Sequence, residues 1–443
     1  MAVTAILGRL AERWSATGFD DLPAEVTEVG RHCLLDWCGC ALAGSVEPLA
    51  QLLRAELPGA GPATVLGAGR SAAARDAALA NGAAGHALDF DDTHTRMPGH
   101  PTAPVLPAAL AVAEELDADG ERLLTALVVG VEVECRVGAL LAPGHYGAGW
   151  HATGTVGTLG AAAAVAHLLD LDAERTAHAL ALAATQAAGL KASFGTMAKP
   201  LHAGKAACDG LLAARLAARG FTGNPAVLEA PQGLAAAAAG TTPPDPARLD
   251  RLEDRWAIRD TLFKYHAACY LTHASINATL ALAGKVDPDE VARVEVHVAP
   301  ELLEVCNIAE PVTGLEGKFS LRATTAMALL GDDTTDTAAY SDARMADADL
   351  IDLRDRVAVV PEVGRAATQA TVVVVTTGDG ERHEAEDDTG RPAADLALQW
   401  DRLSAKFRAL AAPVLGPEGA EALHTAVAGL HPARAIARAA AAG

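Results

Sequence analysis

The chain has 443 residues, enough for two domains, and 51% of them are hydrophobic while only 4% are aromatic. A core must therefore be built largely from Ala, Leu and Val, a composition that favours closely packed helices. Lys plus Arg number 35 against 56 Asp plus Glu, and the formal net charge of −21 disfavours nucleic acid and anionic membranes as partners.

Apolar residues recur at helical spacing along the first 260 residues. A short extended piece at 60–66 interrupts the series, and no alternation of strands and helices typical of a parallel sheet occurs in this part. The predicted helices are residues 1–14, 23–43, 73–87, 105–116, 122–141, 155–169, 174–188, 205–219 and 225–237.

The pattern changes after residue 260. Residues 291–299 alternate with the period of a strand, 357–361 form another short strand, and 370–377 with 381–385 flank a Gly-Asp-Gly turn as a hairpin. Helices are expected at 268–282 and 319–330, and again after Pro392. The sequence thus predicts a mainly α fold, in which both chain ends (1–262 and 395–443) form a large all-α helical domain and 263–394 form an inserted α+β domain. A cleft between the two is the expected site.

Seven scattered cysteines indicate buried free thiols in a reducing compartment. Cys38 and Cys40 have no second Cys/His pair at ligand spacing, so we predict no metal site there. The sequence shows neither a secretory leader nor an apolar run of membrane-spanning length, and we expect a cytoplasmic protein.

One stretch, residues 81–104, is denser than any other in groups that can move protons. The preceding helix should deliver Asp89 to its end, and the Pro and Gly residues predict an irregular loop over 93–100 that returns His100 towards Asp89. An imidazole titrates near neutral pH and a carboxylate can orient it, which suits general acid/base chemistry. The alternative is that the other polar residues here cap helices and bind water: these are Asp91, Asp92 and Thr93.

Three further stretches carry candidate groups. His151 precedes the helix expected from 155, where the helix dipole favours an anion, although local sequence alone favours a structural histidine at such a position. Lys199 precedes Pro200 and should project from a stiff loop. Lys264 and Cys269 lie where the two predicted domains meet. The helical apolar pattern that follows Cys269 favours packing or lining a site over acting as a nucleophile.

With these stretches in view, the chain resembles the MmgE/PrpD family, which includes 2-methylcitrate dehydratase, cis-aconitate decarboxylase and iminodisuccinate epimerase. The resemblance covers nearly the whole length. Its most specific segments are NGAAGHALDFDDTH, HPTAPVLPAALAVAE, HYGAGWHATGTVGTLGAAAA, FGTMAKPLHAGKAA, residues 264–273 and EGKFSL.

The resemblance implies a helical domain with an inserted lid domain, a homodimer, and a site between the domains that needs neither metal nor cofactor. Carried over residue by residue, it assigns catalytic roles to Asp89, His100, His151, Lys199 and Lys264. It assigns substrate contacts to Thr93, Lys199, Lys264 and Cys269. A small di- or tricarboxylate is the implied substrate, with a proton moved at the carbon next to a carboxylate.

The branch within the family stays open on the sequence. Cys269 stands five residues after Lys264, where the decarboxylases have a histidine. Residues 320–323 lack the tyrosine that often follows SLP in the KFSLPY motif of the family. The leading expectation is a lyase that dehydrates or decarboxylates. The alternatives are an epimerase of an iminodisuccinate-like dicarboxylate, favoured by the spacing from Asp92 to His100, and a non-catalytic binding protein on the same fold.

Overall fold

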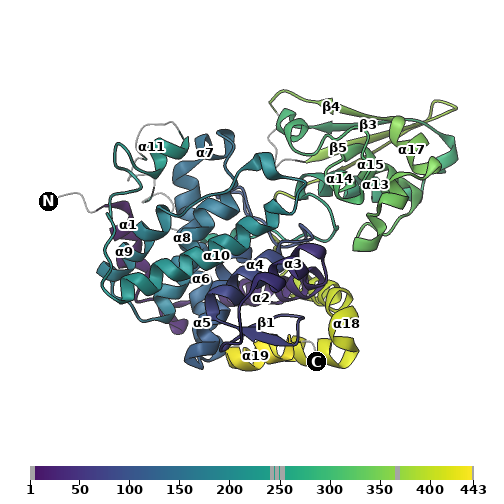
Figure 1. Cartoon of the computed structure of the whole chain (residues 1–443). Helices are drawn as coiled ribbons and strands as arrows, with labels where there is room; N and C mark the ends of the chain where they lie inside the picture. Colours follow the sequence, from purple (N-terminus) through teal and green to yellow (C-terminus); the bar gives the residue numbers. More distant parts are fainter. Residues whose placement is uncertain (1–4, 240–243, 245–248, 250–254, 365–369, 442–443) are drawn as a thin grey trace. The chain divides into compact units, whose positions relative to one another are not determined.

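The structure is a computed structural model that describes residues 5–239, 244, 249, 255–364 and 370–441 (Figure 1). The chain divides into two compact units, Met1–Thr261 with Ala394–Gly443, and Leu262–Ala393. The predicted mainly α fold is confirmed. None of the helices in the described parts of the chain combines the length and the apolar character that a bilayer crossing requires.

The first unit is built from helices with one small two-stranded sheet (Figure 1). Its sheet pairs β1 (Ala63–Val65) with β2 (Arg70–Ala72) in antiparallel fashion. Its helices are α1 (Ile6–Trp14), α2 (Ala24–Ser45), α3 (Pro48–Glu56), α4 (Ala74–Gly85), α5 (Thr102–Leu116), α6 (Gly120–Leu141), α7 (Gly144–Gly147), α8 (Ala152–Leu168), α9 (Ala173–Ala184), α10 (Ala198–Ala218), α11 (Leu234–Ala239), α18 (Leu396–Ala428) and α19 (Ala433–Ala439).

Small residues let the central helices of this unit approach closely. Helix α10 packs on α4, α8 and α5. A Cβ atom added at Gly204 of α10 would lie 2.2 Å from the carbonyl oxygen of Leu79 in α4, and one added at Gly82 of α4 would lie 2.8 Å from the Cα of Gly204. No side chain fits between the two backbones at this crossing, so the end of α4 and the start of α10 are held in a fixed relation.

The second unit contains a four-stranded sheet in the order β4-β3-β5-β6. Strand β3 (Val291–Val298) pairs parallel with β4 (Val357–Pro361) and antiparallel with β5 (Thr371–Thr377), which forms the predicted hairpin with β6 (Arg382–Asp387). Helix α13 (His273–Ala283) packs on β5 and β6, and α15 (Leu321–Leu330) packs on β4 and α13. The described part of this unit also contains three shorter α-helices: α14 (Gly314–Gly317), α16 (Asp342–Met345) and α17 (Ala348–Asp355).

The helix predictions at 73–87, 105–116, 122–141 and 155–169 agree with α4, α5, α6 and α8. Helix α3 was not predicted. The prediction of a helix over 225–237 was wrong for most of its length, because the chain there forms turns as far as Gly233 and Pro231 removes a backbone donor. The helix predicted from residue 205 begins seven residues earlier than expected, at Ala198.

Candidate active site

The turn after α4 carries the acidic residues of the site. Asp89 adopts a left-handed backbone conformation with φ of 53°, which Asp tolerates better than most residues. Behind the turn, the buried ammonium of Lys406 in α18 donates hydrogen bonds to the carbonyl oxygen of Phe90 at 2.7 Å and to Asp36 of α2 at 2.6 Å. Lys406 also lies 3.9 Å from the centre of the Phe90 ring. Helix α18 thus holds Phe90, the residue between the two site acids, in place.

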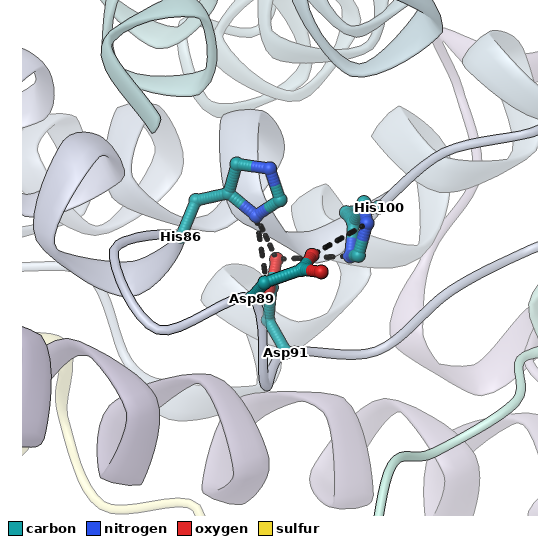
Figure 2. Close-up of side chains that lie close together, drawn as sticks. All are labelled: His86, Asp89, Asp91 and His100. Carbon is teal, nitrogen blue, oxygen red and sulfur yellow. Dashed lines mark hydrogen bonds and ion pairs between the residues drawn. The ribbon is translucent and has the colours of Figure 1, made fainter. Parts of the chain in front are cut away.

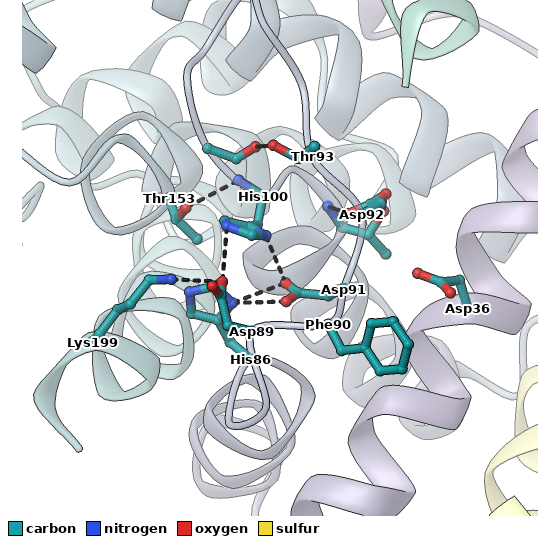
Figure 3. Close-up of polar contacts among 12 residues, drawn as sticks. Asp36, His86, Asp89, Phe90, Asp91, Asp92, Thr93, His100, Thr153 and Lys199 are labelled. Carbon is teal, nitrogen blue, oxygen red and sulfur yellow. Dashed lines mark hydrogen bonds and ion pairs between the residues drawn. The ribbon is translucent and has the colours of Figure 1, made fainter. Parts of the chain in front are cut away.

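Two carboxylates and two imidazoles meet at this turn, as Figure 2 shows. His86 Nδ1 lies 2.9 Å from Asp91 Oδ1. The ring of His100 reaches both acids, with Nδ1 3.4 Å from Asp91 Oδ2 and Nε2 3.4 Å from Asp89 Oδ1. The backbone N–H of His100 donates to Thr153 Oγ1 in α8 at 3.0 Å (Figure 3). The structure therefore agrees with the expectation that the loop returns His100 towards Asp89.

Lys199 joins the cluster from α10. Its ammonium nitrogen lies 2.6 Å from Asp89 Oδ1, and both side chains are 8% exposed (Figure 3). The prediction that Lys199 projects from a loop was wrong, because it lies in the first turn of α10. Pro200 does not break the helix there, since the N–H groups of a first turn have no partner within the helix.

Asp91 and Asp92, although adjacent in the turn, contact different groups. Asp91 faces the imidazoles, whereas the carboxylate of Asp92 accepts hydrogen bonds from the backbone N–H and the hydroxyl of Thr102 at the start of α5. The capping interpretation is therefore right for Asp92. Thr93 Oγ1 donates to the carbonyl oxygen of Gly99 at 3.0 Å, which closes the loop, and its contact with substrate stays a prediction.

His151 occupies the N-cap position of α8 and is 2% exposed. Its ring stacks on that of His86 with a centroid distance of 5.8 Å and meets the edge of Phe194 at 5.0 Å. Phe194 in turn lies 5.1 Å from the ammonium nitrogen of Lys199. His151 therefore belongs to the same group of side chains as Asp89, His100 and Lys199.

Burial and neighbouring charges set the protonation of the cluster. Burial lowers the pKa of His86 to about 4 although Asp91 opposes it. Burial would raise the pKa of the Asp91 carboxyl, but the imidazoles of His86 and His100 outweigh it and hold that pKa well below its usual range. Burial, aided by His86 and Lys199, also lowers the pKa of His151 well below its usual value. The His151 ring is consequently neutral near pH 7 and can accept a proton.

The cluster has donor atoms suited to a metal ion. His86, Asp89, Asp91 and His100 each offer one ligand atom, and these four atoms lie within 4.8 Å of one another. Two imidazoles and two carboxylates suit a transition metal. Lys199 counts against a resident ion, because its ammonium already supplies Asp89 with a positive charge at 2.6 Å. That the site works without a metal stays a prediction, which chelation can test.

Lys264 and Cys269 belong to the second unit and are 1% and 8% exposed. The backbone N–H of Cys269 donates to the carbonyl oxygen of Lys318 at 2.9 Å. Cys269 also faces Cys306, and this contact, together with burial, raises the pKa of the Cys306 thiol well above its usual value. The roles of Lys264 and Cys269 towards a substrate remain predictions.

Two residues of this site, His86 and His202, have no role assigned from the sequence, and the capping role expected for Asp91 is wrong because its carboxylate contacts His86 and His100. His86 and Asp91 lie in the stretch that drew attention, but nothing local shows which acid faces an imidazole. His202 follows Lys199 by three residues, and its Nδ1 lies 3.1 Å from Nδ1 of His151. A correct start for α10 would have placed His202 and Lys199 on one helix face.

Comparison with known proteins gives two family matches and several relatives. The MmgE/PrpD N-terminal domain matches residues 8–247, and the MmgE/PrpD C-terminal domain matches residues 266–431. The chain is 32% identical to the cis-aconitate decarboxylase-like protein oryM of Aspergillus oryzae over 67% of its own length and 65% of that protein's length. It is 30% identical to cis-aconitate decarboxylase of Aspergillus terreus, with 68% of this chain and 67% of that protein covered.

The human cis-aconitate decarboxylase is 35% identical over 56% of this chain and 53% of its own length. The matched region thus spans about two thirds of the fungal relatives and about half of the human one. The two family matches together cover most of the sequence, and the site residues Asp89, His100, His151 and Lys199 all lie within the first of them. The chain belongs to the MmgE/PrpD family.

Proposed function

We propose that the protein is a cofactor-independent lyase that dehydrates or decarboxylates a small di- or tricarboxylate. The observation that carries the proposal is the buried group of Asp89, His100, His151 and Lys199, in which one ammonium and two imidazoles surround a carboxylate. The relatives named as cis-aconitate decarboxylases support a polycarboxylate as the substrate class.

An anionic substrate needs a concentrated positive charge in a chain whose net charge is −21. Lys199 provides that charge on a rigid helix, and its bond to Asp89 fixes the ammonium nitrogen in place. A substrate carboxylate that approaches this nitrogen gains a charge-assisted hydrogen bond in a water-poor environment, where such bonds are stronger than in bulk water. We assign Lys199 to binding one carboxylate and propose Lys264 for a second.

The chemical step moves a proton at the carbon next to a carboxylate. Such a carbon is a weak acid, so a base must act while positive groups stabilise the charge that develops on the carboxylate oxygens. His151 is neutral in the free protein, and the negative charge of a bound substrate raises its basicity. We propose that His151 exchanges the proton with carbon and that His100, oriented by Asp89 and Asp91, handles the second proton.

A dehydration removes a proton from carbon, whereas a decarboxylation adds one, so the imidazoles act in opposite directions in the two lyase reactions. In a dehydration, His151 takes the proton from carbon, and His100 protonates the hydroxyl group that leaves as water. In a decarboxylation, the carboxylate leaves as carbon dioxide, its bonding electrons remain on carbon, and an imidazolium returns a proton to that carbon. Both routes pass through a carbanion whose charge lies next to Lys199, so the same cluster serves either reaction.

An epimerase is the second candidate: the spacing from Asp92 to His100 favours it, and Cys269 counts against the decarboxylase branch. This thiol stands at a position where the decarboxylase branch of the resemblance has a histidine. An epimerase removes a proton from one face of the carbon and returns one to the other, with no leaving group. A non-catalytic binding protein on the same fold is the third candidate, and it predicts no turnover of any acid.

One experiment separates the three candidates. The purified protein is incubated in deuterated water with cis-aconitate, citrate and other di- and tricarboxylates, and proton NMR follows each acid. A lyase produces an alkene, or carbon dioxide with deuterium in the product, and an epimerase returns a deuterated isomer. A protein that leaves every acid unchanged would refute the enzymatic proposal.

Two variants assign the turnover to the cluster. Lys199→Met and His100→Asn should each lower the rate by about 100-fold or more, as the loss of a positioned charge or acid usually does. Lys285→Met is the matched control, because Lys285 is an exposed lysine of the second unit. Size-exclusion chromatography of the same samples tests the homodimer that belongs to this proposal.

A further inference from the structure

His202 and His151 form a pair of imidazoles at one side of the site. Their Nδ1 atoms lie 3.1 Å apart, and their ring centroids lie 5.4 Å apart. His151 precedes α8, whereas His202 lies in α10 one turn after Lys199. The first two turns of α10 thus contribute two contacts, Lys199 to Asp89 and His202 to His151.

Two glycines make room for the His202 ring. A Cβ atom added at Gly154 in α8 would lie 2.9 Å from the Cβ of His202, and one added at Gly189 would lie 3.1 Å from its Cγ. Gly189 has a φ of 141°, a conformation that other residues rarely adopt. Its carbonyl oxygen accepts the backbone N–H of His151 at 3.0 Å. Gly189 therefore both holds the backbone of His151 and leaves space for the ring of His202. The backbone around the two rings is thus shaped to bring them into contact.

The bond between the two Nδ1 atoms fixes the tautomers. Burial lowers the pKa of each ring, so both are neutral near pH 7. A hydrogen bond between two neutral imidazoles needs the hydrogen on one Nδ1 and a lone pair on the other, so the rings are in opposite tautomers. Their access to water differs, because His151 is 2% exposed whereas His202 is only half-buried.

We propose that His202 is a positioning residue that connects His151 to solvent and exchanges the proton that His151 moves during turnover. This inference rests on the proposed function, because it assigns a route to the proton of that reaction. His202 touches His151 and is not required to touch the substrate. It sets the tautomer of His151 and renews its protonation after each turnover.

The proton balance of the step is simple. When Nε2 of His151 accepts a proton from carbon, its ring becomes an imidazolium that carries hydrogens on both nitrogens. The Nδ1 hydrogen passes to the lone pair on Nδ1 of His202, which makes His151 neutral again. His202 then loses its Nε2 hydrogen to water, so one proton enters the pair and one leaves, and the two rings end in exchanged tautomers. The starting tautomers return when His151 gives its Nε2 hydrogen to water in the emptied site, the Nδ1 hydrogen passes back from His202 to His151, and Nε2 of His202 takes a proton from solvent. The reverse sequence brings a proton from water to carbon, as a decarboxylation requires.

Substitution of His202 tests the proposal with a kinetic readout. In His202→Asn, the side-chain amide can still bond to His151 but cannot pass a proton on. We expect kcat to fall about 10-fold or more while KM stays within about twofold, since proton transfer contributes roughly 10²–10⁴ in rate. In His202→Ala, the space left by the ring should admit free imidazole, and added imidazole should restore part of kcat. His202→Gln is a second variant in case the alanine protein is unstable.

His178→Asn is the matched control, because His178 is also a half-buried helical histidine whose Nδ1 bonds to the carbonyl oxygen of Gly223. It should leave kcat and the imidazole response unchanged. The bond itself is measured without substrate, by ¹⁵N NMR of histidine-labelled protein. The wild type should show one Nδ1-protonated ring that hydrogen-bonds to a second Nδ1, and His202→Asn should lose that signal.

The possible results are distinct. If His202→Asn keeps the kcat of the wild type at low buffer concentration, the relay is overturned and the lyase proposal stays intact. Absence of the Nδ1 to Nδ1 bond in the NMR spectrum overturns it whatever the turnover. A wild-type protein that converts no polycarboxylate refutes the proposed function, and the relay falls with it. A lower kcat with imidazole rescue supports both.

Discussion

The ion pair between Lys199 and Asp89 allows a quantitative test of the site. The atoms lie 2.6 Å apart, and each side chain is 8% exposed. Lys199→Met removes the ammonium and leaves the Asp89 carboxylate buried beside the imidazoles. Removal of one partner of a buried pair typically costs about 3–5 kcal/mol, because the remaining charge lacks water and its counter-charge. We expect Lys199→Met to lower the free energy of unfolding by about that amount.

The double variant separates the pair from the individual residues. Lys199→Met combined with Asp89→Asn removes both charges, and it should cost less than the sum of the single variants by roughly 2 kcal/mol or more. Urea unfolding followed by tryptophan fluorescence is the suitable assay. All five tryptophans lie in the unit that contains the pair, so the signal reports the unfolding of that unit.

The exposed pair of Arg408 and Glu421 provides the control. Its side chains are 47% and 56% exposed, and the contact distance is 3.0 Å. Arg408→Met should cost less than about 1 kcal/mol, as exposed pairs do. If Lys199→Met costs no more than Arg408→Met, and its effect adds to that of Asp89→Asn, the charges of the cluster are not coupled as the geometry requires.

Three further predictions concern the surroundings of the cluster. Burial, with Asp36 adding its charge, raises the pKa of Asp92 to about 7, and an unfolded aspartate titrates near 4. The protonated form of Asp92 thus contributes its full stabilisation below about pH 4. The free energy of unfolding falls by about 4 kcal/mol as pH rises from about 4 to 7. Urea unfolding measured across that range should show a smaller fall for Asp92→Asn. Lys406→Met removes the bonds to Phe90 and Asp36, and we expect both kcat and the free energy of unfolding to decrease, whereas the exposed Arg408→Met in the same helix should leave kcat unchanged. Dialysis against EDTA should leave turnover within about twofold of the untreated protein, and loss of activity that added Zn²⁺ restores would show that the cluster of imidazoles and carboxylates holds a metal.

Local sequence was sufficient to predict the loop that carries the site. The glycines and prolines between α4 and α5 end one helix and begin the next, and such signals act within a few residues. The return of His100 towards Asp89 follows from that loop alone. The tasks of Asp91 and Asp92 could not be assigned in the same way. They are neighbours of one residue type, yet one faces two imidazoles and the other caps α5, which depends on side-chain directions fixed by α5 and α8.

The start of α10 shows how a misplaced helix boundary hides the relation between Lys199 and His202. Pro200 was interpreted as a loop residue, although proline fits the first turn of a helix without loss of a hydrogen bond. With the helix starting at Ala198, Lys199 and His202 are three residues apart and share one face. The helix backbone then fixes the separation between the ammonium that pairs with Asp89 and the imidazole that contacts His151. Because one inserted residue would rotate His202 by about 100° around the helix axis, the spacing of Lys199 and His202 is itself a constraint on any sequence that uses both groups at one site.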